Sequence, residues 1–141
     1  MALPPPAPGL VIRFHYLWAR EARRGREEGR YARPCAIVVA ETSDATGKIT
    51  VVVAPVTHSQ PDVGIDAVEL PAAVKRYLGL DDQRSWVIVE ELNSFIWPGH
   101  DLDLNARGEV AYGTLPPNLF QKIRAGVLAA AKAGRLSRIV R

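Results

Sequence analysis

The chain of 141 residues has little cysteine, methionine or histidine: one, one and three residues respectively. A single cysteine, Cys35, cannot form an intramolecular disulfide, and it excludes a metal site built on paired cysteines. Because Cys35 lies within an apolar run, we expect it to be a core residue rather than a nucleophile, since a reactive thiolate needs an exposed electropositive setting. This cysteine usage predicts a reducing, cytoplasmic location.

Long apolar runs are also missing. No segment approaches the ~20 apolar residues that a membrane helix needs, and the N-terminus has neither the basic start nor the apolar stretch of a signal peptide. The sequence contains no His/Cys cluster with zinc spacing, no glycine-rich phosphate loop and no Gly-x-Ser-x-Gly elbow. We therefore expect a protein that is not exported, does not contact a membrane, and uses neither a metal nor another cofactor.

The composition that remains is that of one ordinary globular domain. Apolar residues make up 48% and charged residues 23% of the chain, and the net charge is +3. We expect a single domain over residues 9–134, preceded by a proline-rich extended arm, 1–8, and followed by a basic tail, 135–141.

Two valine-rich runs, 34–39 and 51–56, are continuously apolar and are joined by a segment rich in Asp, Ser and Gly. This pattern predicts a pair of buried antiparallel strands linked by a hairpin. Further strands are predicted at 10–18, 67–70, 85–93 and 108–113, with a helical turn over 71–78. From Pro116 onwards, apolar residues recur at helical spacing: Leu119, Ile123, Val127 and Ala131, widened by Phe120 and Leu128. The predicted class is mostly β, a small β-barrel with a short helix and a C-terminal amphipathic helix.

Residues 20–33 form a charged segment with almost no apolar side chains. It holds six arginines and three glutamates, so its charge alone equals the net charge of the chain. The pattern is typical of a solvated loop. Its position directly before Arg33 also allows a role as an electrostatic lid over a site, in which Arg30 would contact a nucleic acid.

Polar residues stand at the ends of the two valine-rich runs. Arg33 precedes the first run, and Thr57 and His58 follow the second. If the runs are antiparallel neighbours, a guanidinium, a hydroxyl and an imidazole meet at one edge of the sheet. Such a group of side chains suits phosphate chemistry.

A series of short motifs resembles the MazF/PemK family of toxin–antitoxin toxins over roughly residues 9–128. In order, the motifs are Gly9-Leu10-Val11-Ile12, the charged glycine-containing segment, Arg33-Pro34, Ala54-Pro55-Val56-Thr57, Glu69-Leu70, Gly79-Leu80 and Val89-Glu90-Glu91. The resemblance implies an SH3-like barrel that acts as a homodimer. It also implies a metal-independent endoribonuclease that cuts single-stranded RNA once its cognate antitoxin has been degraded.

The resemblance also implies roles for individual residues. Arg33 and Thr57 match the usual active-site residues of that family, and Glu28 matches a glutamate five residues before the arginine. Glu91 and Asn93 stand where the family more often has glutamine and a basic or polar residue. From its residue type, Asn93 is a candidate to contact a base edge and Glu91 to order a basic neighbour or act as a base.

Cleavage of RNA without a metal needs a base for the 2′-hydroxyl, a cation for the developing phosphorane charge and an acid for the leaving 5′-oxygen. Arg33 stays protonated and fits the second role. His58 titrates near neutral pH and fits either proton-transfer role, with Glu28 and His15 as rivals. Trp97, in a turn with His100, is a candidate for base stacking.

Two other functions fit the same residues. A CcdB-like topoisomerase poison or a nucleic-acid-binding regulator would use the barrel for binding alone, and a PemK-like protein could have lost its nuclease. The chain carries no pattern that specifies an RNA sequence preference, an antitoxin or a dimer geometry.

Overall fold

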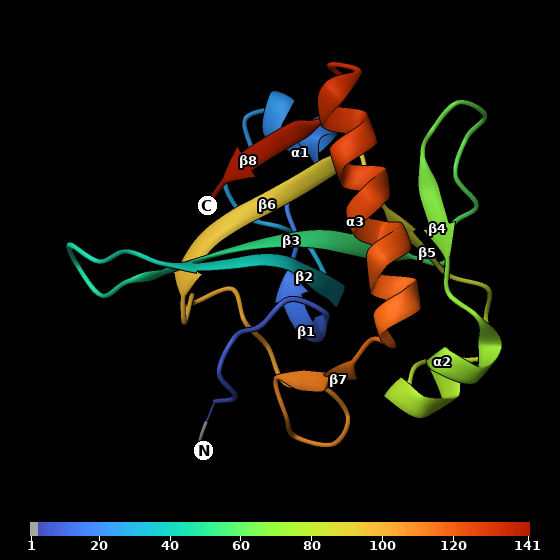
Figure 1. The fold of residues 1–141 in the computed structure, drawn as a ribbon, viewed down its shortest axis with the longest axis horizontal. Coiled ribbons are helices and arrows are strands. Elements are labelled where there is room, and N and C mark those ends of the chain that lie inside the picture. Colours follow the sequence, from blue (N-terminus) through green and yellow to red (C-terminus); the bar gives the residue numbers. More distant parts are fainter. Residues whose placement is uncertain (1–2) are drawn as a thin grey trace.

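The computed structural model describes residues 3–141, and within them the chain forms eight strands and three helices (Figure 1). In chain order the elements are β1 (Leu10–His15), α1 (Ala19–Arg23), β2 (Ala32–Thr42), β3 (Ile49–Thr57), β4 (Ala67–Glu69), α2 (Ala72–Leu78), β5 (Trp86–Ile88), β6 (Glu91–Trp97), β7 (Ala111–Thr114), α3 (Pro117–Lys132) and β8 (Ser137–Val140). Of the expected N-terminal arm, residues 1–2 lie outside the described part, and 3–8 form no helix or strand.

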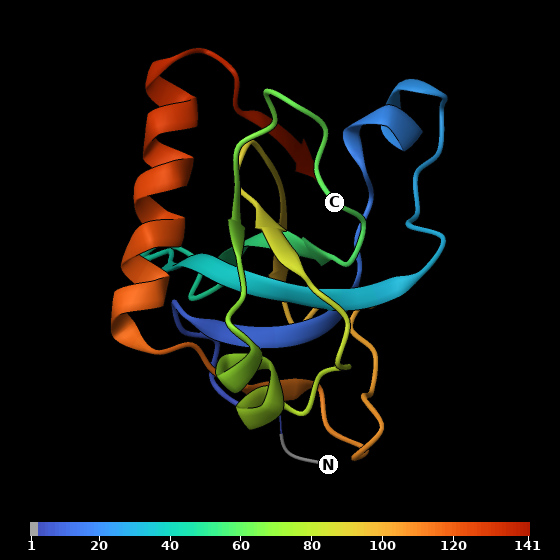
Figure 2. The same ribbon diagram turned by 90° about the vertical axis from the view of Figure 1, so that its right-hand side faces the viewer.

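β3 is the central strand of a curled sheet that resembles half a barrel (Figures 1 and 2). One edge of β3 pairs with β2, and the other pairs with β6 at Ile49–Val53 and with β5 at Val56–Thr57. On its other edge β2 pairs with β1, which in turn pairs with β7, and β5 pairs with β4. These pairings are antiparallel; β8 joins β6 in parallel. The prediction of a mostly β protein with a short helix and a long C-terminal helix is confirmed.

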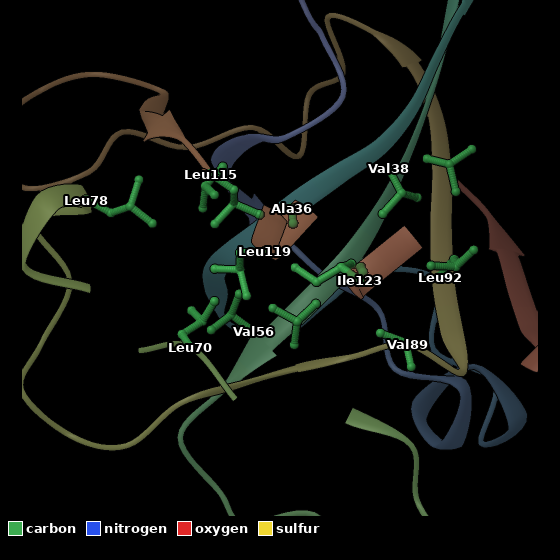
Figure 3. Packing of buried hydrophobic residues seen from close by; sticks show 14 residues of the cluster. Ala36, Val38, Val56, Leu70, Leu78, Val89, Leu92, Leu115, Leu119 and Ile123 are labelled. Carbon is green, nitrogen blue, oxygen red and sulfur yellow. The ribbon is translucent and has the colours of Figure 1, made fainter. Parts of the chain in front are cut away.

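The valine-rich runs are continuously apolar because both faces of β2 and β3 are buried. Ala36 of β2 and Val56 of β3 belong to one hydrophobic cluster, to which α3 contributes Leu119 and Ile123 (Figure 3). Ile37, on the opposite face of β2, belongs to a second cluster, which the curl of the sheet encloses; Val51, Val53, Phe14, Phe95 and Val110 are also in it. Cys35 is fully buried in this second cluster, as expected.

α3 follows the prediction at its start but not at its end. Leu119 and Ile123 are buried, whereas Ala131 and Leu128 are exposed and Ala130 is buried instead. Four residues cover slightly more than one helical turn, so a series at four-residue spacing drifts by about 40° at each step. Eleven residues complete slightly more than three turns, which returns position 130 to the face of Leu119.

Several element boundaries differ from those expected. The first strand ends at His15 rather than at residue 18, and the charged segment contains the short helix α1. The predicted strand 85–93 is two strands, β5 and β6, separated by a bend at Val89 and Glu90. β5 pairs with the end of β3, and β6 pairs with its first half. Residues 137–140, expected in a basic tail, form β8 on the free edge of β6.

Candidate functional site

The ends of β2 and β3 meet as the sequence predicted. Their antiparallel register places Cys35 opposite Pro55, which brings Arg33 to the end of β3. Arg33 Nη1 donates to the carbonyl oxygen of Val56 at 3.4 Å. The first residues of one strand and the last residues of the other therefore form one edge of a cleft.

This cleft, called here the Arg33 cleft, has a volume of about 480 Å³, within the usual range for ligand pockets. It is lined by Arg13, Tyr31, Ala32, Arg33, Pro34, Val56, His58, Gly79, Leu80, Asp81, Ser85, Asn105, Ala106, Arg107 and Tyr112. The structure thus brings Arg33 and His58 together. Thr57 is not among the lining residues; its Oγ1 accepts a hydrogen bond from the backbone N–H of Ser59 at 3.1 Å. Thr57 is the last residue of β3, and His58 follows it outside the strand.

Arg33 forms no salt bridge with a carboxylate among the described residues. Within residues 3–141 no carboxylate oxygen lies within 4.0 Å of its guanidinium, and Arg33 Nε is buried without a hydrogen-bond partner. Its guanidinium carbon lies 4.9 Å from the centroid of the Trp18 ring, a cation–π contact. Burial lowers the pKa of Arg33, and the neighbouring charge of Arg20 adds to this effect, partly offset by Cys35 and Glu21. An unpaired, half-buried guanidinium is favourable for binding an anion.

The rest of the cleft is also positively charged. Arg13 donates to the Tyr112 hydroxyl at 3.2 Å, and Arg107 donates to the Tyr112 carbonyl oxygen at 2.7 Å. Asp81 is the one carboxylate among the described lining residues, and Lys75 Nζ binds it at 2.6 Å. The hydrogen bond from Lys75 is the largest of the effects that lower the pKa of Asp81, so this side chain stays anionic at neutral pH.

The sequence argument did not include Arg13, Arg107 and Tyr112. Arg13 left a signal, because it lies on the polar face of the first strand and pairs with Pro34, next to Arg33, once β1 and β2 are aligned. Arg107 and Tyr112 come from the loop before β7 and the strand itself. No periodic pattern in that region points toward β2, so they emerge only from the tertiary fold.

Arg30 lies in a second pocket that adjoins the Arg33 cleft. This pocket, called here the arginine pocket, has a volume of about 220 Å³ and is lined by Tyr16, Trp18, Arg20, Glu21, Arg24, Arg30, Tyr31 and Arg33. Tyr31 and Arg33 line both cavities. The charged segment therefore does stand beside Arg33, on the side of the molecule opposite α3 (Figure 2).

Glu28 lies away from both cavities. It is exposed and borders a shallow depression formed by Gly25, Arg26 and Glu27 at the tip of the charged segment. The carboxylate that acts on Arg33 is Glu21 instead. The five-residue spacing to Arg33 does not bring Glu28 to the cleft, because α1 and the turn after it fold the segment outward.

Glu91 and Asn93 have structural contacts rather than a place in the cleft. Glu91 Oε1 accepts hydrogen bonds from the Tyr16 hydroxyl and the Ala19 N–H, both at 3.1 Å. Asn93 is fully buried; its amide accepts from the Leu17 N–H at 2.9 Å and donates to the Leu17 carbonyl at 2.8 Å. The interpretation of Asn93 as a base-contacting residue is corrected, because its side chain lies in the interior, in the middle of β6, and its amide is bonded to Leu17.

His15 and Trp97 also lie outside the two cavities. His15 Nε2 is 3.0 Å from Asp103 Oδ2, an interaction between β1 and the loop that follows β6. Trp97 pairs with Ile49, at the opposite end of β3 from Thr57. At ~3.3 Å per residue, eight residues of strand separate these ends by roughly 26 Å.

Within residues 3–141 no group of three His, Cys, Asp or Glu side chains is placed to hold a metal ion. None of the described helices is both long and apolar enough to cross a membrane. A scan of the chain against protein-family models gives no match. A search of curated proteins gives no significant match.

Proposed function

We propose that this protein is a metal-independent endoribonuclease that acts on single-stranded RNA, as the toxin of a MazF/PemK-like toxin–antitoxin pair. The observation that carries the proposal is the unpaired guanidinium of Arg33 beside the imidazole of His58 in one positively charged cleft. The ordered motif series from Gly9 to Glu91 supports it independently of the cleft. On the same resemblance we propose a cognate antitoxin, a homodimer with an SH3-like barrel and action in the cytoplasm.

In the proposed reaction, the 2′-hydroxyl oxygen attacks the adjacent phosphorus and the bond from phosphorus to the 5′-oxygen breaks. The products are a 2′,3′-cyclic phosphate and a 5′-hydroxyl, so one proton leaves the 2′-hydroxyl and one reaches the 5′-oxygen. Arg33 donates hydrogen bonds to the non-bridging phosphate oxygens, whose negative charge grows in the transition state. His58 carries one of the two proton transfers, and the other exchanges with water at the exposed mouth of the cleft.

The other lining residues bind and orient the substrate. Arg13 and Arg107 add positive charge near Arg33, and their bonds to Tyr112 fix both side chains in place. Asp81 does not neutralise this charge, because Lys75 already binds its carboxylate. The substrate is therefore a polyanion with its phosphate directed toward Arg33.

The test is incubation of the purified protein with end-labelled single-stranded RNA in excess chelator. We expect cleavage to products with 2′,3′-cyclic phosphate ends, identified by mass spectrometry, and no cleavage at a linkage whose 2′-hydroxyl is replaced by hydrogen. Arg33→Ala should slow cleavage by about 10²- to 10³-fold, on the scale of other lost transition-state donors. The matched control is Arg138→Ala, at an exposed arginine that lines neither cavity. Intact RNA, or equal cleavage by both variants, would refute the proposal.

A pH–rate profile tests the part of His58. A histidine that transfers a proton makes the rate depend on its protonation state, so the wild-type pH–rate profile should show a limb that this residue causes. His58→Gln should be slower and should lack that limb. If the limb persists in His58→Gln, another group carries the proton transfer.

A non-catalytic nucleic-acid-binding module is the second candidate. It is favoured by one observation: among the described residues of the cleft, His58 is the only imidazole, and the carboxylate of Asp81 is committed to Lys75. Such a module would bind single-stranded RNA through Arg33 and leave it whole. Binding lost in Arg33→Ala, without cleavage by the wild type, would support this candidate, including a nuclease that has lost its activity.

A further inference from the structure

The arginine pocket has a net positive charge of its own, beside that of the Arg33 cleft. Four of its eight lining residues are arginines, and Glu21 is its one carboxylate. Glu21 already accepts a hydrogen bond from the Trp18 N–H at 3.2 Å and lies 3.8 Å from Arg26 Nε. Glu21 therefore offsets one charge at most, and the pocket keeps a net positive charge.

The other three arginines have no acidic partner. Within residues 3–141, Arg20, Arg24 and Arg30 make no salt bridge within 4.0 Å and no side-chain hydrogen bond. All three are exposed, so none is required to fill the core. Arg84 and Arg135, which are also at the surface, pair with Glu69 and Asp66, whereas Arg20, Arg24 and Arg30 line one pocket together without such a partner.

Local contacts hold the pocket in place beside the cleft. The backbone N–H of Ala19, at the start of α1, is bound by Glu91 of β6, and the Trp18 N–H is bound by Glu21. At the other end of the segment, Gly29 passes so close to the backbone oxygens of Tyr16 and His15 that any side chain would collide with them. The segment is therefore tied down before and after its exposed tip.

Trp18 lines the arginine pocket and contacts Arg33, which lines both cavities. The guanidinium carbons of Arg20 and Arg33 each lie 4.9 Å from the centroid of its ring, so they are no further apart than twice that distance. Tyr31, which lines both cavities, is highly exposed at their boundary, with 67% of its surface accessible. An aromatic ring between two cationic sites matches a base between two phosphates.

We propose that the arginine pocket binds a second phosphate of the same RNA strand, next to the phosphate that is cleaved at Arg33, with the intervening base against Tyr31. This inference rests on the proposed function, and it defines the substrate as a strand with at least two consecutive charged linkages. A single strand is favoured over an acidic peptide because the two cavities share Arg33 and Tyr31, so one continuous chain of alternating phosphates and bases fills both.

The first test compares two triple variants of equal charge. Arg20→Gln, Arg24→Gln and Arg30→Gln together remove the pocket's own charge, and Arg76→Gln, Arg124→Gln and Arg138→Gln remove the same charge at exposed positions that line neither cavity. On a long single-stranded RNA, the pocket variant should lose about tenfold to a hundredfold in kcat/KM relative to the control variant. On a dinucleotide with one linkage, the two variants should be equal.

The second test neutralises the substrate instead of the protein. A methylphosphonate in place of one phosphate next to the cleaved linkage should slow the wild type by a similar factor, on one side of the cleaved linkage only. The pocket variant should not respond to that substitution, because its contact is already gone. Equal losses in the wild type and in the pocket variant would refute the second phosphate site.

A binding measurement separates this inference from the proposed function. A 2′-O-methyl RNA cannot be cleaved, and its affinity should fall with salt with a slope that is smaller by about 0.7 in the pocket variant than in the control variant. Binding with this change, but without cleavage of ordinary RNA, would support the phosphate site and refute the nuclease. Cleavage of ordinary RNA with no difference between the two triple variants would support the nuclease and refute the second phosphate site. An acidic peptide that binds the wild type but not the pocket variant, with RNA binding unchanged, would overturn the assignment to RNA.

Discussion

Two arginines in this protein, Arg141 with a buried side chain and Arg33 with a half-buried one, have opposite surroundings. Arg141, with 3% of its side chain exposed, contacts Asp101 at 3.2 Å and donates to the His15 carbonyl oxygen at 2.8 Å and to Asn93 Oδ1 at 3.0 Å. Arg33 has no carboxylate partner within the described residues and one long hydrogen bond to a carbonyl oxygen. The two side chains are chemically identical, but the charge of Arg141 is balanced by a carboxylate and carbonyl oxygens, whereas the charge of Arg33 is not.

The difference separates a charge that holds the fold together from a charge that is available to a ligand. A buried ion is stabilising only when its partners replace the lost water, and Arg141 has such partners. Arg33 lacks them, so the fold bears the cost of its desolvation, and a phosphate that binds there recovers part of that cost. The four predictions below test this distinction, from the largest expected effect to the smallest.

Arg141→Ala should give the largest change in stability. It leaves the nearly buried carboxylate of Asp101 without its cation, and it removes a donor from the buried amide of Asn93, so we expect a loss of about 3–5 kcal/mol in the free energy of unfolding. Urea denaturation measures this. Arg138→Ala, at an exposed position of the same strand region, should stay within about 0.5 kcal/mol of the wild type. If the two variants are equally stable, the contacts of Arg141 with Asp101 and Asn93 do not stabilise the fold.

Arg33→Ala should show the opposite behaviour. The transition state for RNA cleavage should lose about 3–4 kcal/mol of stabilisation. The free energy of unfolding should change by less than about 1 kcal/mol, because removal of an unpaired charge offsets the lost contact with Trp18. Cleavage kinetics and urea denaturation of the same preparation give both numbers. A loss of stability as large as that of Arg141→Ala would make Arg33 a structural residue.

Tyr31→Glu should make Arg33 resemble Arg141. The new carboxylate would lie at the boundary of both cavities, where it can pair with the free guanidinium and repel phosphate. We expect cleavage of RNA to fall by about tenfold relative to Tyr31→Gln, which removes the ring without adding a charge. Equal rates in the two variants would mean that the charge of Arg33 is not what binds the substrate.

The smallest expected effect is a change in the pH dependence of stability at Asp81, the cleft carboxylate that pairs with Lys75. Since its folded-state pKa is depressed, Asp81 stabilises the fold above its unfolded pKa of about 3.9, and this contribution is lost as the pH falls through the folded value. Lys75→Met should weaken the dependence of the urea midpoint on pH below about pH 4. Asp82→Asn, one residue along, serves as the control. An unchanged pH dependence in Lys75→Met would show that the pair does not act in this way.

The meeting of Arg33 with the end of β3 could be predicted because it follows from strong local patterns. Two continuously apolar runs with hairpin residues between them leave few alternatives to an antiparallel pair, and the register then fixes which ends are neighbours. The place of His58 directly after the second run was also informative, because His58 lines the cleft. Thr57 was predicted from the same place and from the resemblance, but it does not line the cleft.

The parts that could not be predicted depend on contacts between distant segments. α1 has five residues and almost no apolar pattern, and it is held by Glu91, more than seventy positions away. Asn93 follows an apolar run and resembles a strand end, but its amide binds Leu17 in the interior. Arg107 reaches the cleft from an irregular loop. Such residues carry no local signal, because their partners are set by the tertiary fold.

The position of Trp18 between Arg20 and Arg33 has a spectroscopic consequence. Indole emission depends on nearby charges, and a phosphate that draws either guanidinium away from the ring changes that field. The other two tryptophans, Trp86 and Trp97, lie outside both cavities, so replacing them with phenylalanine would leave a single emitter at the site. The protein thus contains an intrinsic fluorophore through which occupation of the proposed phosphate sites can be followed in real time without a label.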